Sequence, residues 1–379
     1  MLENDRPHDA GYDARFERAL GEAITSALAR SGDSPVVEQV LWHFGLGRDG
    51  GQRRGKRLRP RLLIQVALDE NGTFDDALDA ALAVECLHNY SLVHDDVEDG
   101  DALRHGRASV WARYGVPHAV NAGDSMCAIS YLTLLRNTAG HRADRVTAMA
   151  TVLHAANLAM SAGQAFDLGF ETAAHVTLDA YAAMIDGKTG VLFGAACELG
   201  ALAAGAPDER ARAYGELGRA YGRAFQIRDD VLGTWGSLQE TGKSTRCDVT
   251  RRKWTYPLVW ALAGPPTPER DAIARRYAPG APLCPSDVAA VVDALDVLGA
   301  KSAAQRAYHD QLATARRLAA AHRIDRDGRV AALVQANGAP PVSCAASSMS
   351  SGSRGRRRKS TIETTSTRTT AVRIPSSIG

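Results

Sequence analysis

The residues of this chain best suited to chemistry are three aspartates near the end of an Ala/Leu-rich run. They are Asp95, Asp96 and Asp99, in the stretch HNYSLVHDDVED. On a helix Asp95 and Asp99 share a face, and Asp96 lies about 100° round from Asp95. Burying these carboxylates is costly unless a cation balances them. Oxygen ligands on one helical face suit Mg²⁺, which takes further ligands from water and substrate phosphates. Taken alone, the stretch is also compatible with a solvated acidic helix end.

A second acidic cluster resembles the first. The stretch FQIRDDVLG, residues 225–233, places Asp229 and Asp230 near the end of a helix that begins near Asp208. In both clusters a helix of small and apolar residues ends in Asp-Asp. The chain therefore carries two acidic clusters of the same kind.

Cationic loops accompany the two clusters along the chain. Residues 50–60, GGQRRGKRLRP, form a Gly-flanked loop that presents backbone amides and fixed positive charge, as diphosphate binding requires. The residues RHGR, 104–107, follow the first cluster within one loop, so ligands for a metal and for phosphate oxygens alternate. A nucleic-acid surface is disfavoured, because the basic run is short and contains no aromatic residue.

A third candidate for phosphate binding is the segment 186–190, DGKTG, which places Lys188 and Thr189 between glycines. It interrupts the apolar pattern before a helix over 191–204. Its spacing differs from that of a nucleotide-binding P-loop. A plain surface turn is the alternative interpretation.

The elements that must position these residues are predicted to be helices. The sequence is 45% hydrophobic but only 6% aromatic, so its core must consist mainly of Ala, Leu and Val, which suits closely packed helices. The fold class is therefore all-α. Besides the helices that carry the clusters, the pattern predicts helices over 13–31, 35–44, 117–139, 143–171, 256–263, 267–278, 286–298, 300–322 and 327–336.

The ends of the chain differ in character from its body. Residues 1–12 are expected to be disordered, 13–336 to form one domain, and 337–379 to be a disordered Ser/Thr/Arg-rich tail. This tail carries about +6, which leaves about −4 on the rest of the chain. Six scattered cysteines, no signal peptide and no apolar run of about 18 residues favour a cytoplasmic protein without stable membrane insertion.

Together the motifs resemble those of the trans-polyprenyl diphosphate synthase family, most closely its geranylgeranyl diphosphate synthases. The resemblance extends from about Gly50 to Pro257. It rests on GKRLRP at 55–60, HNYSLVHDDVED at 88–99 with RHG at 104–106, GQAFD at 163–167, KT at 188–189, and FQIRDD at 225–230 followed by GK and KWT. It implies a single large helical bundle of the isoprenoid synthase type around a central cavity. It also implies a homodimer that binds no nucleic acid.

The resemblance implies a role for each matched residue. Asp95, Asp96 and Asp99 would hold Mg²⁺, or Mn²⁺ in its place, on an allylic diphosphate, and Asp229 and Asp230 would hold a further ion on the opposite wall. The side chains that would contact the same diphosphate are Arg104, Lys188, Lys243 and Lys253. Those that would bind isopentenyl diphosphate are Lys56, Arg59 and His88, with His105 beside them. Thr189 and Gln226 would line the cavity near the reacting carbons.

Two positions depart from the family pattern. His105 stands where arginine is usual, so a contact to isopentenyl diphosphate becomes titratable. The second acidic motif ends in Gly233, which leaves two carboxylates where three are typical. In the family, bulky residues four and five positions before the first aspartate limit the product, and here these are Ser91 and Tyr90. This pair resembles that of enzymes making a C20 product, and a C15 product is the alternative.

Two other functions share part of this pattern. A class I terpene cyclase shares the fold and the first motif, but it would carry an Asn/Asp, Ser/Thr and Glu metal triad in its second half and has no use for GKRLRP. A non-catalytic subunit that regulates an active synthase is compatible with His105 and Gly233. The intact DDVED and the lysine loops favour the enzyme.

Overall fold

Helix α4, Phe74–Glu98, carries the first acidic cluster in its last turns and at its C-cap residue, Asp99. The helix begins with a capping box, in which the Asp76 N–H donates to Thr73 Oγ1 (3.1 Å) and the Thr73 N–H donates to Asp76 Oδ2 (2.8 Å). Helices α3 (Leu58–Asp69), α6 (Val116–Leu135) and α9 (Val191–Ala203) pack around it. Neighbours on several sides explain why residues 80–87, in the middle of α4, are all buried.

The computed structural model describes residues 10–47, 55–236, 246–277 and 283–338. These residues form helices and one two-stranded hairpin, which confirms the all-α fold class. The remaining elements are α1 (Ala10–Leu28), η2 (Ala29–Ser31), α2 (Pro35–Phe44), β1 (Leu103–Arg104), β2 (Arg107–Ala108), α5 (Val110–Tyr114), α7 (Ala143–Phe170), α8 (Leu178–Ile185), η3 (Asp186–Gly190), α10 (Asp208–Trp235), α12 (Cys247–Thr250), α13 (Tyr256–Ala263), α14 (Pro268–Tyr277), α15 (Pro285–Val297), α16 (Ala300–His322) and α17 (Arg329–Gly338).

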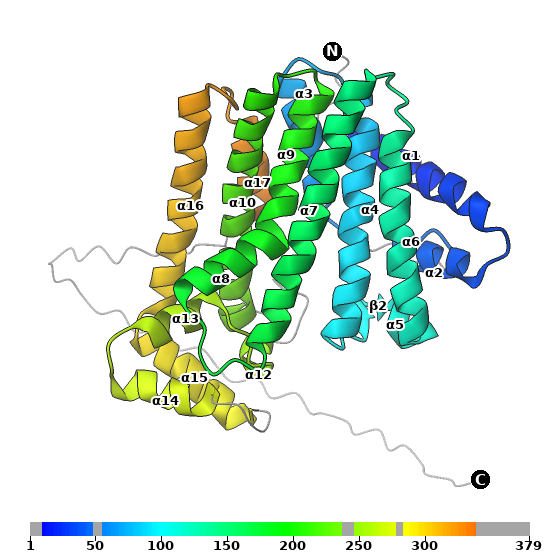
Figure 1. Cartoon of the computed structure of the whole chain (residues 1–379). Coiled ribbons are helices and arrows are strands. Elements are labelled where there is room, and N and C mark those ends of the chain that lie inside the picture. Colours follow the sequence, from blue (N-terminus) through cyan, green and yellow to red (C-terminus); the bar gives the residue numbers. More distant parts are fainter. Residues whose placement is uncertain (1–9, 48–54, 237–245, 278–282, 339–379) are drawn as a thin grey trace, which may run out of the picture. The chain divides into compact units, whose positions relative to one another are not determined.

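The long helices lie side by side, and both acidic clusters lie at the same end of the bundle. Helix α10 packs between α9 and α16, and α7 packs against α9. In Figure 1 the lower end of α4 meets the hairpin and α5, and α12 lies at this same end. The bundle thus brings the C-terminal ends of α4 and α10 and the loops that follow them into one region.

The core consists mostly of small aliphatic side chains, as the composition predicts. Alanine, leucine and valine dominate the buried cluster, and tyrosines such as Tyr181, Tyr214 and Tyr221 fill the larger spaces. Small residues let helix axes approach closely, as at Gly200 on α9, where a Cβ would lie 2.2 Å from the Leu63 carbonyl oxygen of α3. In the described ranges, no helix is long and apolar enough to span a membrane.

Most predicted helices are confirmed to within a few residues, and 35–44, 256–263 and 300–322 have the predicted bounds. Helix α1 starts at Ala10, inside the segment expected to be disordered, and α17 extends to Gly338. The rest of the two predicted disordered ends lies outside the described residues. One interpretation was wrong: the segment 186–190 does not break the helical path but forms a π-helical turn that joins α8 to α9.

Candidate active site

The three carboxylates of the first cluster lie in different surroundings. Asp96 is 1% exposed and forms an ion pair with Arg104. The Arg104 Nε–H donates a hydrogen bond to Asp96 Oδ1 at 3.0 Å. Asp99 Oδ2 accepts a hydrogen bond from Lys253 Nζ at 3.0 Å. The Asp95 carboxylate accepts no hydrogen bond from the part of the chain that the structure describes, and burial raises its pKa to about 6. Asp95 is therefore the carboxylate of this cluster left open for a cation.

A short hairpin presents Arg104 and His105. Strands β1 and β2 pair antiparallel, with Arg104 opposite Arg107, and the two turn residues His105 and Gly106 have φ values of 52° and 79°. Positive φ at both positions is the signature of the tight turn that suits a two-residue hairpin. The pKa of His105 is lowered by burial and by the charges of Arg104 and Arg57, so its ring is neutral at pH 7. The sequence gives little warning of this hairpin, because its strands are two residues long.

The segment GKRLRP leads into α3 and lies beside the hairpin. Arg57 has a left-handed backbone and is fixed by Glu17 and Glu85, at 2.8 and 2.5 Å. Lys56, one residue earlier, is exposed. A Cβ on Gly55 would lie 4.0 Å from His105 Nε2, so the start of this segment and the hairpin turn are neighbours.

Arg59, near the end of this segment, pairs with His88 of α4. Arg59 Nη1 lies 3.0 Å from His88 Nε2, and the guanidinium lies over the Phe193 ring at 4.7 Å. Burial, followed by the charge of Arg59, keeps the pKa of His88 well below its usual value, so its Nε2 accepts the hydrogen bond. Burial lowers the pKa of Arg59 to about 10, and the charges of Glu85, Asp229 and Asp95 oppose that effect. Arg59 thus lies within electrostatic range of both acidic clusters.

Lys188 and Thr189 lie on the π-helical turn η3, which crosses α7 at a glycine. A Cβ on Gly163 of α7 would lie 2.1 Å from the Lys188 backbone nitrogen, so only glycine allows this crossing. Lys188 Nζ then donates to Asp167 Oδ2 of α7 at 2.6 Å. Burial disfavours the ammonium, but Asp95 and Asp167 outweigh that effect and raise its pKa. Such π turns often occur at functional sites.

The two carboxylates of the second cluster differ in their hydrogen bonding: Asp230 is fully hydrogen-bonded within the protein, and Asp229 remains open for a cation. Asp230 is 5% exposed and accepts hydrogen bonds from the Tyr181 hydroxyl (2.5 Å), the Tyr256 N–H (2.7 Å) and Gln226 Nε2 (3.0 Å). Burial raises its pKa to about 7 in spite of these donors. From the residues that the structure describes, Asp229 accepts only a long contact, from Arg228 at 3.4 Å. Burial raises its pKa to about 6, and Arg228, Lys56 and Arg59 act in the opposite direction.

Thr189 and Gln226 connect η3 to this second cluster. The Thr189 hydroxyl donates to Gln226 Oε1 at 2.8 Å, and the Gln226 amide donates onward to Asp230. Thr189 is buried, which excludes the plain surface turn as the interpretation of 186–190. Sequence reasoning missed the tyrosine partners of Asp230, because no local pattern links Tyr181 and Tyr256 to it.

The two residues expected to set product length point in different directions. Ser91 donates its hydroxyl to the His88 carbonyl at 2.8 Å. The Tyr90 ring packs edge-on against His94, 4.9 Å between centroids, and lies beside Ser161 of α7 and Cys127 of α6. Tyr90 therefore faces the α6 and α7 side of α4. Lys243 lies outside the described residues.

The site suits a divalent ion held jointly with a phosphorylated substrate. In the described ranges no three acidic, histidine or cysteine side chains converge tightly enough to hold a metal by themselves. Mg²⁺ typically binds one or two carboxylates and completes its shell with water and substrate phosphates. The open carboxylates of Asp95 and Asp229, with cations beside them, match that mode.

Comparisons with known proteins agree with this geometry. The polyprenyl synthetase family model matches residues 48–295. A geranylgeranyl diphosphate synthase of Mycobacterium tuberculosis H37Rv is 37% identical over 317 residues, 82% of this chain and 89% of the relative. A (2E,6E)-farnesyl diphosphate synthase of the same organism is 38% identical over 249 residues, 64% of this chain and 68% of the relative. The crystal structure of a polyprenyl synthetase from Streptomyces coelicolor A3(2) superposes with a TM-score of 0.76 at 28% identity, covering 85% of this chain and 97% of that one.

Proposed function

The chain belongs to the polyprenyl synthetase family and is a trans-prenyl diphosphate synthase, and on this premise we propose that it joins isopentenyl diphosphate to allylic diphosphates with Mg²⁺, up to geranylgeranyl diphosphate. The observation that carries the proposal is the placement of one open carboxylate at each acidic cluster, with cations between them. The charge of Arg59 interacts with both Asp95 and Asp229. Lys253 donates a hydrogen bond to Asp99, and its charge also interacts with Asp248.

In this proposal the allylic diphosphate lies between the two clusters. Asp95 and Asp99 would hold ions on one side, and Asp229 would hold an ion on the other. When bound, such ions would supply positive charge against the leaving diphosphate. Lys188 and Lys253, now paired with Asp167 and Asp99, are placed to add their charge to the same oxygens.

Asp96 has a different role, because its carboxylate is committed to Arg104. We assign to it the positioning of the Arg104 guanidinium, which pairs with it on the hairpin. A buried carboxylate that accepts from Nε fixes the plane of the guanidinium and leaves other N–H groups to point at a ligand. The metal role expected for Asp96 is thus left to Asp95 and Asp99.

The second substrate, isopentenyl diphosphate, is proposed to bind at the segment GKRLRP. Lys56 and Arg59 supply charge, His88 shares a hydrogen bond with Arg59, and the neutral His105 offers a ring N–H. The double bond attacks the allylic carbon as its C–O bond breaks. A proton then leaves the new chain, and the departing diphosphate is its acceptor. Apolar walls shield the cationic carbon from water.

Product length is proposed to be C20. Ser91, one turn before Asp95, is small and leaves room for a chain longer than C15. The larger Tyr90 ring is proposed to stop the chain at C20. The relatives named as farnesyl and as geranylgeranyl diphosphate synthases have similar identity to this chain, so identity alone does not separate C15 from C20.

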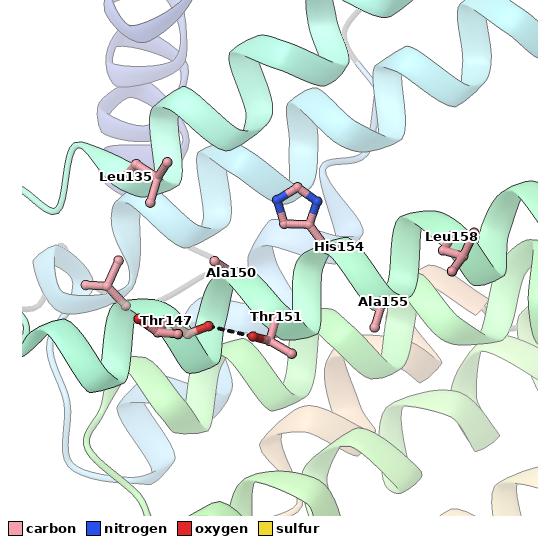
Figure 2. Close-up of a pocket in the computed structure, with 8 residues that line it drawn as sticks. Leu135, Thr147, Ala150, Thr151, His154, Ala155 and Leu158 are labelled. Carbon is pink, nitrogen blue, oxygen red and sulfur yellow. Dashed lines mark hydrogen bonds between the residues drawn. The ribbon is translucent and has the colours of Figure 1, made fainter.

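We also propose that two copies pair through α6 and α7. An open groove there is lined by Leu135, Val146, Thr147, Ala150, Thr151, His154, Ala155 and Leu158 (Figure 2). Leu158 is 75% exposed and Leu135 is 57% exposed, and Leu132 of α6 is exposed as well. An apolar surface of this kind marks an interaction site, and a second copy of the chain would cover it. Light scattering of the purified protein tests this pairing.

The function is tested by incubating the protein with isopentenyl diphosphate, Mg²⁺ and each allylic diphosphate from C5 to C15. The products are then dephosphorylated, separated by chromatography and identified by mass spectrometry. A C20 alcohol that disappears when the metal is chelated is the expected result. A product that stops at C15 contradicts the chain-length assignment alone. No condensation from any primer contradicts the proposed reaction and favours a regulatory subunit.

A further inference from the structure

Gly233 lies one helical turn after Asp229, on the same face of α10. It has the same spacing from Asp229 as Asp99 has from Asp95 in the first cluster. A Cβ built on Gly233 would lie 1.7 Å from Asp248 Oδ2 and 2.5 Å from Asp248 Cγ. The carboxylate of Asp248 therefore occupies the space where the side chain of residue 233 would begin.

The backbone around Asp248 fixes it in that space. Asp248 belongs to the short helix α12, which packs against α10, and its carbonyl accepts a hydrogen bond from the Lys253 N–H at 2.9 Å. The charge of Asp248 also contributes to the raised pKa values of Asp229 and Asp230, after the larger effect of burial. Its carboxylate thus lies close to both acids of the second cluster.

Asp230 is poorly available to an ion, because its two oxygens already accept three hydrogen bonds from the protein. Within the described part of the chain Asp229 has a single contact, at 3.4 Å, and its side chain is 42% exposed. Side chains one turn apart on a helix have Cβ atoms about 5–6 Å from each other, which places the Asp248 oxygen roughly one turn from Asp229. A Mg²⁺ ion with its bound water spans such a distance.

We propose that Asp248 is the third carboxylate of the second acidic wall and that, with Asp229, it holds the divalent ion there in place of the side chain that Gly233 lacks. Asp230 is then a positioning residue, which fixes Tyr181, Tyr256 and Gln226. This inference rests on the proposed function and adds a residue to its site. The same short segment carries Lys253, which bonds Asp99 on the first wall, so 248–253 contacts both walls.

The experiment is a titration of the full-length protein with Mn²⁺ in the presence of inorganic diphosphate, with free Mn²⁺ measured by electron paramagnetic resonance. Asp248→Asn keeps the side chain's shape and removes its charge. We expect it to weaken Mn²⁺ binding about ten- to hundredfold, as the loss of a metal-supporting group does. Asp33→Asn, in an exposed turn, makes the same chemical change and is the matched control.

A swap variant, Gly233→Asp with Asp248→Gly, moves the carboxylate back onto α10. It is expected to recover Mn²⁺ binding to within a few-fold of the unmodified protein, with thermal melting confirming that both variants are folded. Wild-type Mn²⁺ binding by a folded Asp248→Asn variant overturns the inference. Condensation by the unmodified protein is measured alongside, so that failure of the proposed reaction is told apart from failure of this assignment.

Discussion

The crossing of α7 and η3 at Gly163 makes a sharp prediction about how Lys188 is positioned. In Gly163→Ala, the new Cβ would lie 2.1 Å from the Lys188 nitrogen, 2.5 Å from the Gly187 carbonyl carbon and 2.8 Å from the Lys188 Cα. All three atoms belong to the backbone, so no side-chain rotation can relieve the overlap. The π turn must move away from α7, and Lys188 must move with it.

The size of the effect follows from these distances. Ordinary contact begins near 3.4 Å, so the two backbones must separate by about 1.3 Å at the closest pair. Overpacking of this kind costs about 1–3 kcal/mol of unfolding free energy. A displacement of about 1 Å at a group that binds substrate can lower the rate about a hundredfold. We therefore expect both a lower melting temperature and a large loss of kcat/KM.

Gly169 on the same helix provides a matched control. Its added Cβ would meet nothing within 4 Å, and alanine is the better helix former by up to about 1 kcal/mol. Gly169→Ala should therefore keep its activity and melt no lower than the unmodified protein. Thermal melting and steady-state kinetics with a saturating second substrate measure both variants. If Gly163→Ala behaves like Gly169→Ala, the crossing does not position Lys188.

Three further substitutions test product length, diphosphate binding and pH dependence. Tyr90→Ala should give products longer than C20 by mass spectrometry, because it removes the ring proposed to stop the chain; unchanged length refutes this. His105→Arg should lower KM for isopentenyl diphosphate about three- to tenfold, because a permanently charged guanidinium replaces the neutral ring. An unchanged KM would show that the hairpin turn does not contact this substrate. His43 is partly buried, desolvation lowers its pKa to about 4, and its ring Nε2 lies 2.9 Å from Asn89 Oδ1. Since the unfolded chain binds this proton near pH 6.5, unfolding free energy should fall by about 3 kcal/mol between pH 6.5 and 4, and a chemical-denaturation series should show less of that fall in His43→Gln.

The sequence predicts the helices well because they are long, rich in alanine and leucine, and punctuated by glycine and proline. It also places the acidic clusters at helix ends and the cations in neighbouring loops. It fails at 186–190, where two glycines look like a helix break. Gly187 lets η3 pass close to Gly163 of α7, whereas Gly190 lies against Gly222 of α10, so both requirements come from residues more than twenty positions away in the sequence.

The distinction between open and tied carboxylates is also invisible in the sequence. Asp95 and Asp96 are adjacent and identical in type, yet only Asp96 meets Arg104 of the hairpin. Asp229 and Asp230 differ in the same way, because Tyr181 and Tyr256 approach α10 from distant parts of the chain. Such partners are determined by packing between helices, and no local spacing encodes them.

The measurement that tests the central claim most directly is anomalous diffraction from crystals grown with Mn²⁺ and inorganic diphosphate. The account predicts manganese peaks beside Asp95 and Asp99 on one wall and beside Asp229 and Asp248 on the other, with the diphosphate between them. Manganese confined to other places, or diphosphate bound without metal at either wall, would contradict it.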